Sequence, residues 1–263
     1  MTYSCIELRV VFLKQELDRI AQKGTIDSSG RLVVDPRSLS DPDKALLDMR
    51  QQYLESWQEV ILIVEHDPKI GCRGVTLNRP AASRADQRLS TALAQALSAD
   101  EIVKEQNLSN KKIIDASSFD SAFGQRIAAY VGCPDRSKVM NQKSQAMLIH
   151  GIADLENARE LSPGLGIFRG GLTDAIQRVK NKQNDPFDFR FFLGSYEWGP
   201  GEIEKHIAHG VYKPVACSRA IALKQCIALP QPMWHEIADM LGGSIKEVSR
   251  LELMKRNDSS ASS

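Results

Sequence analysis

The sequence predicts an α+β fold, and three observations carry this prediction. Residues 60–64 form a continuous run of valine, isoleucine and leucine, which is typical of a strand covered on both faces of a sheet. Strand-like and helix-like segments follow one another without the strict alternation of a doubly wound parallel sheet. With 263 residues, the chain is long enough for one large domain, or for one domain with an extension.

The N-terminal segment is predicted to be helical over residues 5–22. Its apolar residues recur at helical spacing: Ile6, Val10, Leu13, Leu17 and Ile20. A second helix is expected over residues 41–57, with Ser40 as its N-cap. We therefore expect residues 1–50 to form a helical extension. The segment also lacks the basic leader, apolar core and cleavage site of a typical signal peptide.

The remaining elements follow from local patterns. We expect strands at residues 31–34, 60–64, 75–77, 130–131, 147–149, 189–193 and 215–217. The second and third of these should form a hairpin around Asp67-Pro68. We expect helices at residues 90–105, 174–181, 202–208 and 232–241. Turns or bends are expected at residues 24–30 and 164–168. The last stretch, residues 251–263, is a polar, serine-rich tail that we expect to be disordered.

The composition is that of an ordinary globular protein. Hydrophobic residues make up 42% of the chain and charged residues 25%. The formal net charge of +1 gives no support for DNA binding or for attraction to an anionic membrane. No apolar run approaches the roughly 18–20 residues that span a bilayer. Five cysteines without a repeated spacing favour a reducing compartment over a disulfide framework.

The turn before the helix at residues 202–208 is rich in glycine and could hold an anion. Backbone N–H groups are free at a helix start, where the helix dipole is positive, so Gly199-Pro200-Gly201 could contact a negative group. In the alternative interpretation, Trp198 packs, Pro200 presets the first helical turn, and the glycines only let the chain turn. We favour the second interpretation, and the sequence leaves both open.

A second polar cluster flanks the predicted hairpin. His66 precedes its turn, and Asn78-Arg79-Pro80 follows its second strand. The hairpin could bring these residues together at one end of the sheet, where they would form a site. Alternatively, they cap strand ends by hydrogen bonds, which is the default interpretation.

The chain lacks the common cofactor and metal motifs. Residues 164–170 resemble a dinucleotide fingerprint, but the last glycine comes one residue late. His206 and His209 share a helix face without a third ligand, so we predict neither a metal nor a cofactor. Cys217 lies near Arg219, which could lower its pKa, or it is a small buried hydrophobe.

Four short motifs, taken in order, resemble the YqgE/AlgH family. They are residues 64–80, 130–134, 148–151 and 193–204, and the resemblance covers about residues 53–245. The second half is most similar to the plant and algal branch, whose members are expected in the chloroplast stroma. Two features depart from the family: Cys133 replaces a glycine of Gly-Gly-Pro, and residues 81–123 form an insertion.

The resemblance implies an α+β domain over residues 51–250, with a strongly curved, pseudo-barrel sheet flanked by helices. It implies no established activity, and bacterial members are labelled transcriptional regulators. We therefore expect a non-enzymatic binding or regulatory protein, for an anionic small molecule or a protein partner. Its expected binding residues are His66, Asn78, Arg79, Pro80, Gly132, Trp198, Gly199 and Gly201.

Two other functions stay open at this stage. A small hydrolase or thiol-redox enzyme would use His66, His150 or Cys217, with a base within hydrogen-bond reach of a nucleophile. A DNA-binding protein would need a clustered basic face. In the leading hypothesis, Arg79 would instead pair bidentately with an anionic group.

Overall fold

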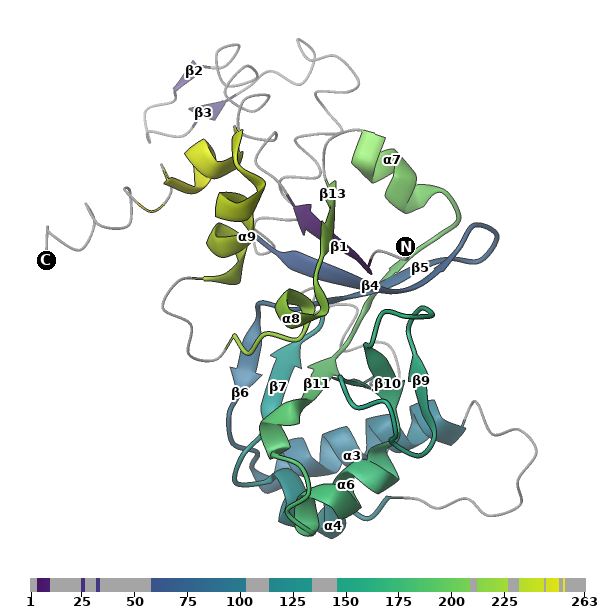
Figure 1. Cartoon of the computed structure of the whole chain (residues 1–263). Helices are drawn as coiled ribbons and strands as arrows, with labels where there is room; N and C mark the ends of the chain where they lie inside the picture. Colours follow the sequence, from purple (N-terminus) through teal and green to yellow (C-terminus); the bar gives the residue numbers. More distant parts are fainter. Residues whose placement is uncertain are drawn as a thin grey trace, which may run out of the picture.

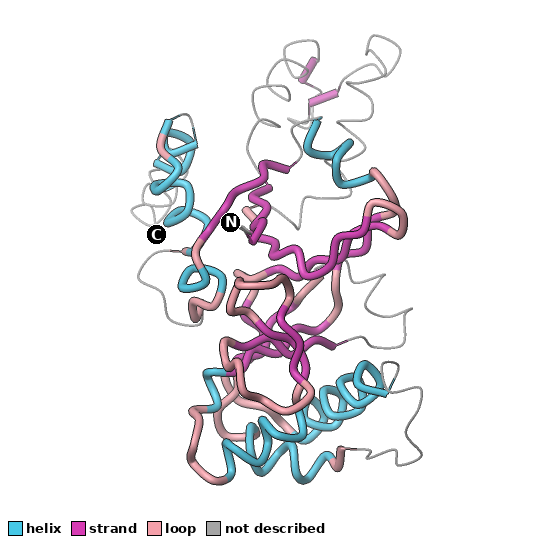
Figure 2. The backbone as a smooth tube through the Cα atoms, turned by 45° about the vertical axis from the view of Figure 1, so that its right-hand side comes forward, coloured by secondary structure: helices cyan, strands magenta, loops and turns pink. Residues whose placement is uncertain are grey.

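The computed structural model has an α+β fold, as the sequence predicts (Figure 1). The structure describes residues 4–9, 25–26, 32–33, 58–102, 114–133, 146–208, 212–226, 232–243, 245–250 and 253. Within these residues, the strands form a five-stranded sheet, a six-stranded sheet and a two-stranded sheet. The two large sheets lie one above the other in Figures 1 and 2.

The five-stranded sheet is antiparallel throughout and has the order β12-β5-β4-β1-β13. Its strands are β1 (Ser4–Arg9), β4 (Val60–Asp67), β5 (Gly71–Thr76), β12 (Tyr196–Trp198) and β13 (Tyr212–Cys217). The predicted hairpin is confirmed as β4–β5, with Ile61 opposite Thr76 and Asp67 opposite Gly71.

The six-stranded sheet is mixed and has the order β6-β7-β11-β8-β10-β9. Its strands are β6 (Pro80–Ala82), β7 (Ala128–Val131), β8 (Ala146–His150), β9 (Ala158–Glu160), β10 (Phe168–Gly170) and β11 (Phe189–Leu193). Only β7 and β11 pair in parallel. The small sheet pairs β2 (Thr25–Ile26) with β3 (Leu32–Val33).

Helices flank the sheets on both sides. The helical elements are α3 (Gln87–Ile102), α4 (Ala116–Phe123), α6 (Leu172–Lys180), η3 (Pro186–Asp188), α7 (Glu202–Ala208), α8 (Arg219–Ala222) and α9 (Met233–Leu241). Figures 1 and 2 place α3, α4 and α6 together beneath the six-stranded sheet, and α7 beside the five-stranded one. No helix within the described residues is long and apolar enough to cross a membrane.

Three apolar clusters hold these layers together. The first lies between the sheets and joins Val60 and Leu62 of β4 to Tyr130 of β7 and Phe192 of β11. Because side chains alternate along a strand, the odd-numbered phenylalanines of β11 face the helices instead. There the ring of Phe191 meets the ring of Phe119 edge-on, with 5.3 Å between centroids.

The third cluster packs α7 against the outer face of the five-stranded sheet. Ile203 of α7 contacts a layer that contains Ile61, Tyr196 and Trp198. A polar contact also joins the two large sheets, because the buried Arg169 guanidinium of β10 pairs with the Glu65 carboxylate of β4. The hairpin β4–β5 therefore packs against the six-stranded sheet on one face and against α7 on the other.

The N-terminal prediction is wrong where the structure describes it. Residues 4–9 form the strand β1, which pairs with β4 on one side and β13 on the other. The sequence from Ile6 to Val10 alternates apolar and polar residues, so it fits a strand as well as a helix. Pairing with two neighbouring strands favours the strand over the helix. The rest of the predicted first helix and the helix at residues 41–57 lie outside the described residues, as does the predicted tail at residues 251–263 except for the helical residue 253.

Candidate functional site

The predicted cluster of His66 with Asn78 and Arg79 is not formed. His66 lies opposite Cys72 near the hairpin turn, whereas Asn78 bonds to Val60 at the start of β4. Val60 and His66 are six residues apart on β4, which corresponds to about 20 Å at about 3.3 Å per residue. The two halves of the predicted site therefore occupy opposite ends of the hairpin.

Asn78 holds the start of β4. Its Oδ1 accepts the Val60 N–H at 3.0 Å, and its Nδ2 donates to the Gln58 carbonyl oxygen at 2.8 Å. Both ends of the amide are therefore engaged with main chain. This geometry matches the default interpretation, in which the residue caps a strand end.

Arg79, Pro80 and Gly132 lie where the two large sheets meet. The Arg79 carbonyl oxygen accepts the Val131 N–H at 2.8 Å, and Pro80 lies opposite Tyr130 in the β6–β7 pair. The Gly132 N–H donates to Leu193 at 2.8 Å, while its carbonyl oxygen accepts the Thr76 N–H at 2.9 Å. Gly132 thus ties β11 of one sheet to β5 of the other.

The unusual Cys133 fits this turn without positive φ. The non-glycine residues with positive φ within the described part are Gln58, Asn157 and Lys182. Cys133 is 1% exposed and packs in the same apolar cluster as Trp198. The replacement of a glycine at position 133 is therefore accommodated by the core.

His66 lies beside α7. Its Nε2 is 3.0 Å from the Glu204 Oε1, and both side chains are about half exposed. The hydrogen bond from His66 lowers the pKa of the Glu204 carboxyl below its usual value. His66 is therefore close to the Gly199–Gly201 turn, although Arg79 is not.

The glycine turn itself is stabilised by the carboxylates of its own helix. The Gly199 N–H donates to the Glu202 Oε2 at 2.8 Å, and both Glu202 and Glu204 lie in the first turn of α7. These negative side chains already compensate the positive end of a helix of seven residues. Gly201, with φ of 71°, makes the turn into the helix. The geometry thus favours the structural interpretation of this turn.

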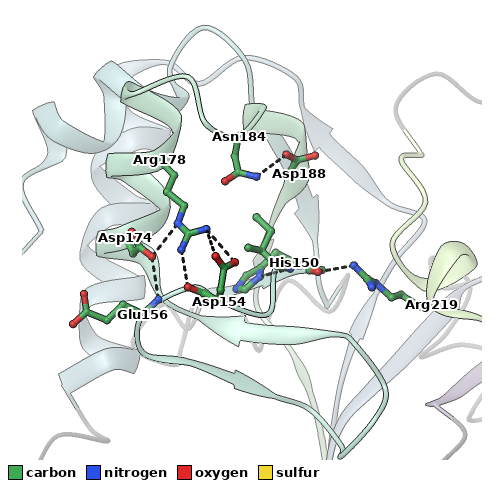
Figure 3. Close-up of polar contacts among 10 residues, drawn as sticks. His150, Asp154, Glu156, Asp174, Arg178, Asn184, Asp188 and Arg219 are labelled. Carbon is green, nitrogen blue, oxygen red and sulfur yellow. Dashed lines mark hydrogen bonds and ion pairs between the residues drawn. The ribbon is translucent and has the colours of Figure 1, made fainter.

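His150, the last residue of β8, is fully buried (Figure 3). Its Nδ1 accepts the Ile152 N–H at 3.2 Å, and its Nε2 lies 3.2 Å from the Gly170 carbonyl oxygen. The proton therefore resides on Nε2. Burial lowers the pKa of His150 to about 4, so the ring is neutral at physiological pH. Both ring nitrogens bond to main chain, so His150 connects the end of β8 to Gly170 of β10 and to Ile152 in the following loop.

An arginine clamp fixes the loop that follows β8, and sequence analysis missed it. Arg178 of α6 donates from Nη1 to both Asp154 carboxylate oxygens at 3.1 Å, and from Nη2 to the Asp154 carbonyl oxygen at 2.6 Å. Its Nε donates to Asp174 at 3.1 Å, and Asp174 in turn accepts the Glu156 N–H at 3.0 Å (Figure 3). The four-residue spacing of Asp174 and Arg178 was the available signal.

Arg219 of α8 reaches the same loop from the other side (Figure 3). Its Nη2 donates to the Gly151 carbonyl oxygen at 2.5 Å. A Cβ on Gly151 would lie 2.5 Å from that nitrogen, and one on Gly166 would lie 3.1 Å from the Arg219 Cδ. The exposed arginine therefore runs across two glycines. The neighbouring Cys217 thiol donates to the Ser218 carbonyl oxygen at 3.5 Å.

A further polar group lies at the end of the core between the sheets. We call it the Arg190 cluster and define it as Arg190, Tyr130, Gln225 and Cys226. The Tyr130 hydroxyl donates to the Gln225 Oε1 at 2.8 Å and accepts the Cys226 N–H at 3.4 Å. Burial raises the pKa of Tyr130, and it raises the pKa of the Cys226 thiol to about 11. Both groups are therefore neutral at physiological pH.

The described residues contain no group of three or more His, Cys, Asp or Glu side chains that could hold a metal ion. A metal site of this kind is therefore not available within that part of the chain.

Comparisons with known proteins place the chain among relatives. A family model described as AlgH-like matches residues 46–246. The crystal structure of a protein from Corynebacterium diphtheriae is 16% identical, covers 73% of this chain and 82% of its own, and has a TM-score of 0.46. The solution structure of the AlgH protein from Pseudomonas aeruginosa is 18% identical, with coverages of 73% and 83% and a TM-score of 0.43. No curated protein matches the chain.

Proposed function

This chain belongs to the AlgH-like family, and from that premise we propose that it acts by binding and not by catalysis. The observation that carries the proposal is the state of His150. A general base needs a free lone pair within hydrogen-bond reach of its substrate. The lone pair on Nδ1 of His150 is occupied by the Ile152 N–H, and the ring is fully buried.

The other candidate catalytic groups support the same proposal. The thiol of Cys217, the candidate nucleophile, donates to the Ser218 carbonyl oxygen at 3.5 Å. Cys226, which the sequence did not suggest as a nucleophile, is no better suited, because burial raises the pKa of its thiol to about 11 and the thiolate is the nucleophilic form. The His66 ring is engaged with Glu204 on the surface beside α7. A hydrolase or thiol-redox mechanism would have to break these interactions first.

We propose that the ligand is not DNA. The net charge is +1, and several cations of the described residues pair with carboxylates, which reduces the positive potential of their faces. These cations are Arg73, Arg126, Arg169, Arg178, Lys224 and Arg250. A small anionic molecule or an acidic group of a partner suits isolated cationic positions better than a duplex does.

We propose that the binding residues expected from the sequence form the frame of the protein's binding surface. Gly132 joins the two sheets, Asn78 holds the start of β4, and Trp198 packs in the apolar layer beneath α7. Their substitution would then weaken binding through the fold, and not through lost ligand contacts.

The second half of the sequence resembles the plant and algal branch of the family, whose members are expected in the chloroplast stroma. We propose that location for this protein. A fluorescent fusion of the full chain, expressed in plant leaf cells, should coincide with chlorophyll fluorescence. A diffuse signal in the cytosol would contradict the proposal.

A thermal-shift screen tests the proposed function. The full chain is screened against nucleotides and phosphorylated metabolites, and each compound that raises the Tm is recovered and analysed after incubation. We expect stabilisation by at least one compound, which is recovered unchanged. Conversion of a compound by the wild type, abolished in His66→Gln or Cys217→Ser, would show that the protein is an enzyme.

A further inference from the structure

Arg190 is a buried cation within a strand of the six-stranded sheet. It lies on β11, is 7% exposed, and is opposite Ile149 of β8 and Ala128 of β7. Both of these neighbours belong to the core cluster between the sheets, as does Phe192 two residues further on. The alternation of side chains along β11 therefore directs Arg190 toward the inter-sheet core, and not toward solvent.

The guanidinium of Arg190 has few interactions within the described part of the chain. Its Nη1 donates to the Asp188 carbonyl oxygen at a long 3.5 Å, and its buried Nε has no hydrogen-bond partner. None of the described carboxylates lies within ion-pair distance of it. A buried charge without a partner costs several kcal/mol, and arginine does not escape this cost by losing its proton.

The Asp188 carboxylate acts on Arg190 from beyond ion-pair distance, and the other neighbours do not supply a negative charge. Burial lowers the pKa of Arg190, and it raises the pKa values of the Tyr130 hydroxyl and the Cys226 thiol. If either neighbour were ionised, it would neutralise the arginine, but both stay protonated at physiological pH. The Arg190 cluster is thus a low-dielectric site that carries one net positive charge.

The cluster lies close to the surface on one side. Residues 223–226, which follow α8, are half-buried, and they include Gln225 and Cys226. The Gln225 amide donates to the Phe187 carbonyl oxygen at 3.0 Å and so fastens this segment to η3.

We propose that the Arg190 cluster binds the oxyanion group, carboxylate or phosphate, of a small molecule. The planar guanidinium offers a fork of N–H donors that matches two oxygens of such a group. The Tyr130 hydroxyl, whose proton can rotate away from Gln225, is the second donor beside it. This inference rests on the proposed binding function and names the chemistry of its ligand.

Calorimetric titration and thermal shifts of the full chain test the inference. The probes are sodium phosphate and sodium acetate, each compared with sodium chloride at the same ionic strength. One arm tests a phosphate ligand and the other a carboxylate. We expect one of the two to bind wild type and to raise its Tm. In Arg190→Met, which loses a charged hydrogen-bond pair, the same probe should bind about 10- to 100-fold more weakly.

Two controls make the result specific. Arg159→Met removes an exposed arginine from β9 and should leave binding of the probe unchanged. Arg190→Lys keeps the charge but loses the fork, and it should also weaken binding. If Arg190→Met does not fold, site-resolved alkylation of wild type replaces it. A bound anion should slow alkylation of Cys226 and leave the rate at Cys217 unchanged.

The outcomes separate the inference from the proposed function. If wild type and Arg190→Met bind the probe equally, binding stands and the assignment of Arg190 is wrong. If neither probe binds wild type, or neither slows alkylation of Cys226, the oxyanion site is overturned. The metabolite screen then decides whether the protein binds a ligand elsewhere.

Discussion

The main-chain oxygen of Trp198 lies 2.1 Å from the position that a Cβ on Gly71 would occupy. Strands β12 and β5 therefore approach so closely at this point that only glycine fits at position 71. Gly71 also has a φ of 125°, which other residues rarely adopt. Trp198 itself packs in the apolar layer between the sheet and α7, so the glycine-rich turn that follows it is part of the architecture.

Gly71→Ala should destabilise the protein by about 3 kcal/mol or more, because backbone strain and a main-chain clash add. Urea unfolding monitored by Trp fluorescence measures the change. Gly164→Ala is the matched control, since Gly164 has a φ of 78° and open space around it. That control should cost only about 1–2 kcal/mol. Equal losses for the two variants would show that the close approach to Trp198 has no energetic weight.

Asn78→Ala should cost about 1–3 kcal/mol, because it removes both hydrogen bonds that hold the start of β4. Asn78→Asp keeps the acceptor for the Val60 N–H and loses the donor to Gln58, so its effect should be intermediate. Urea unfolding gives both values. A variant of full stability that fails to bind a ligand would instead identify Asn78 as a direct contact.

His150 should make stability fall in acid. Its pKa is about 4 in the folded protein and about 6.5 in the unfolded chain, so the unfolded chain takes up a proton first as the pH falls. The contribution is fully present above pH 6.5 and is lost between pH 6.5 and 4. By linkage, wild type should lose about 2–3 kcal/mol between pH 7 and 4.5 from this group.

Denaturant unfolding at the two pH values, for wild type and for His150→Gln, isolates this contribution. The variant has no titrating ring, so its loss of stability over the same range should be smaller. Parallel pH profiles for the two proteins would show that His150 does not titrate with a lowered pKa.

Arg178→Gln should release the loop after β8 without unfolding the sheet. The variant loses the contacts that hold Asp154 and orient Asp174, which accepts the Glu156 N–H. Amide hydrogen exchange at Glu156 should become at least about tenfold faster, because its opening is local. Exchange in β11 serves as the internal control. An unchanged exchange rate at Glu156 would show that Arg178 does not hold the loop after β8.

Much of the fold was predictable because its signals are local. The strand Phe189–Leu193 and the helix Glu202–Ala208 have the bounds that the sequence predicts. A run of aromatic residues and a glycine-proline turn leave few alternatives at these places. By contrast, Ser4–Arg9 fits a helix or a strand equally well by pattern, and its two partners in the sheet lie far along the chain.

The site was predicted less well, for physical reasons. His66 and Asn78 are close in sequence, but an extended hairpin places them at its opposite ends. The position of Arg190 within an apolar strand was a signal for a special site, since a charged residue there must be buried or paired. Its lack of a carboxylate partner within the described residues depends on three-dimensional packing, which no local pattern encodes.

Native mass spectrometry tests the central claim, that this AlgH-like chain acts by binding, most directly. The full chain is mixed with a pool of phosphorylated and carboxylated metabolites, and both the retained mass and the composition of the pool are measured. We predict a single small molecule bound per chain, released intact on denaturation, with the rest of the pool unchanged. Depletion of a pool member and the appearance of its product in proportion to protein concentration would contradict the account.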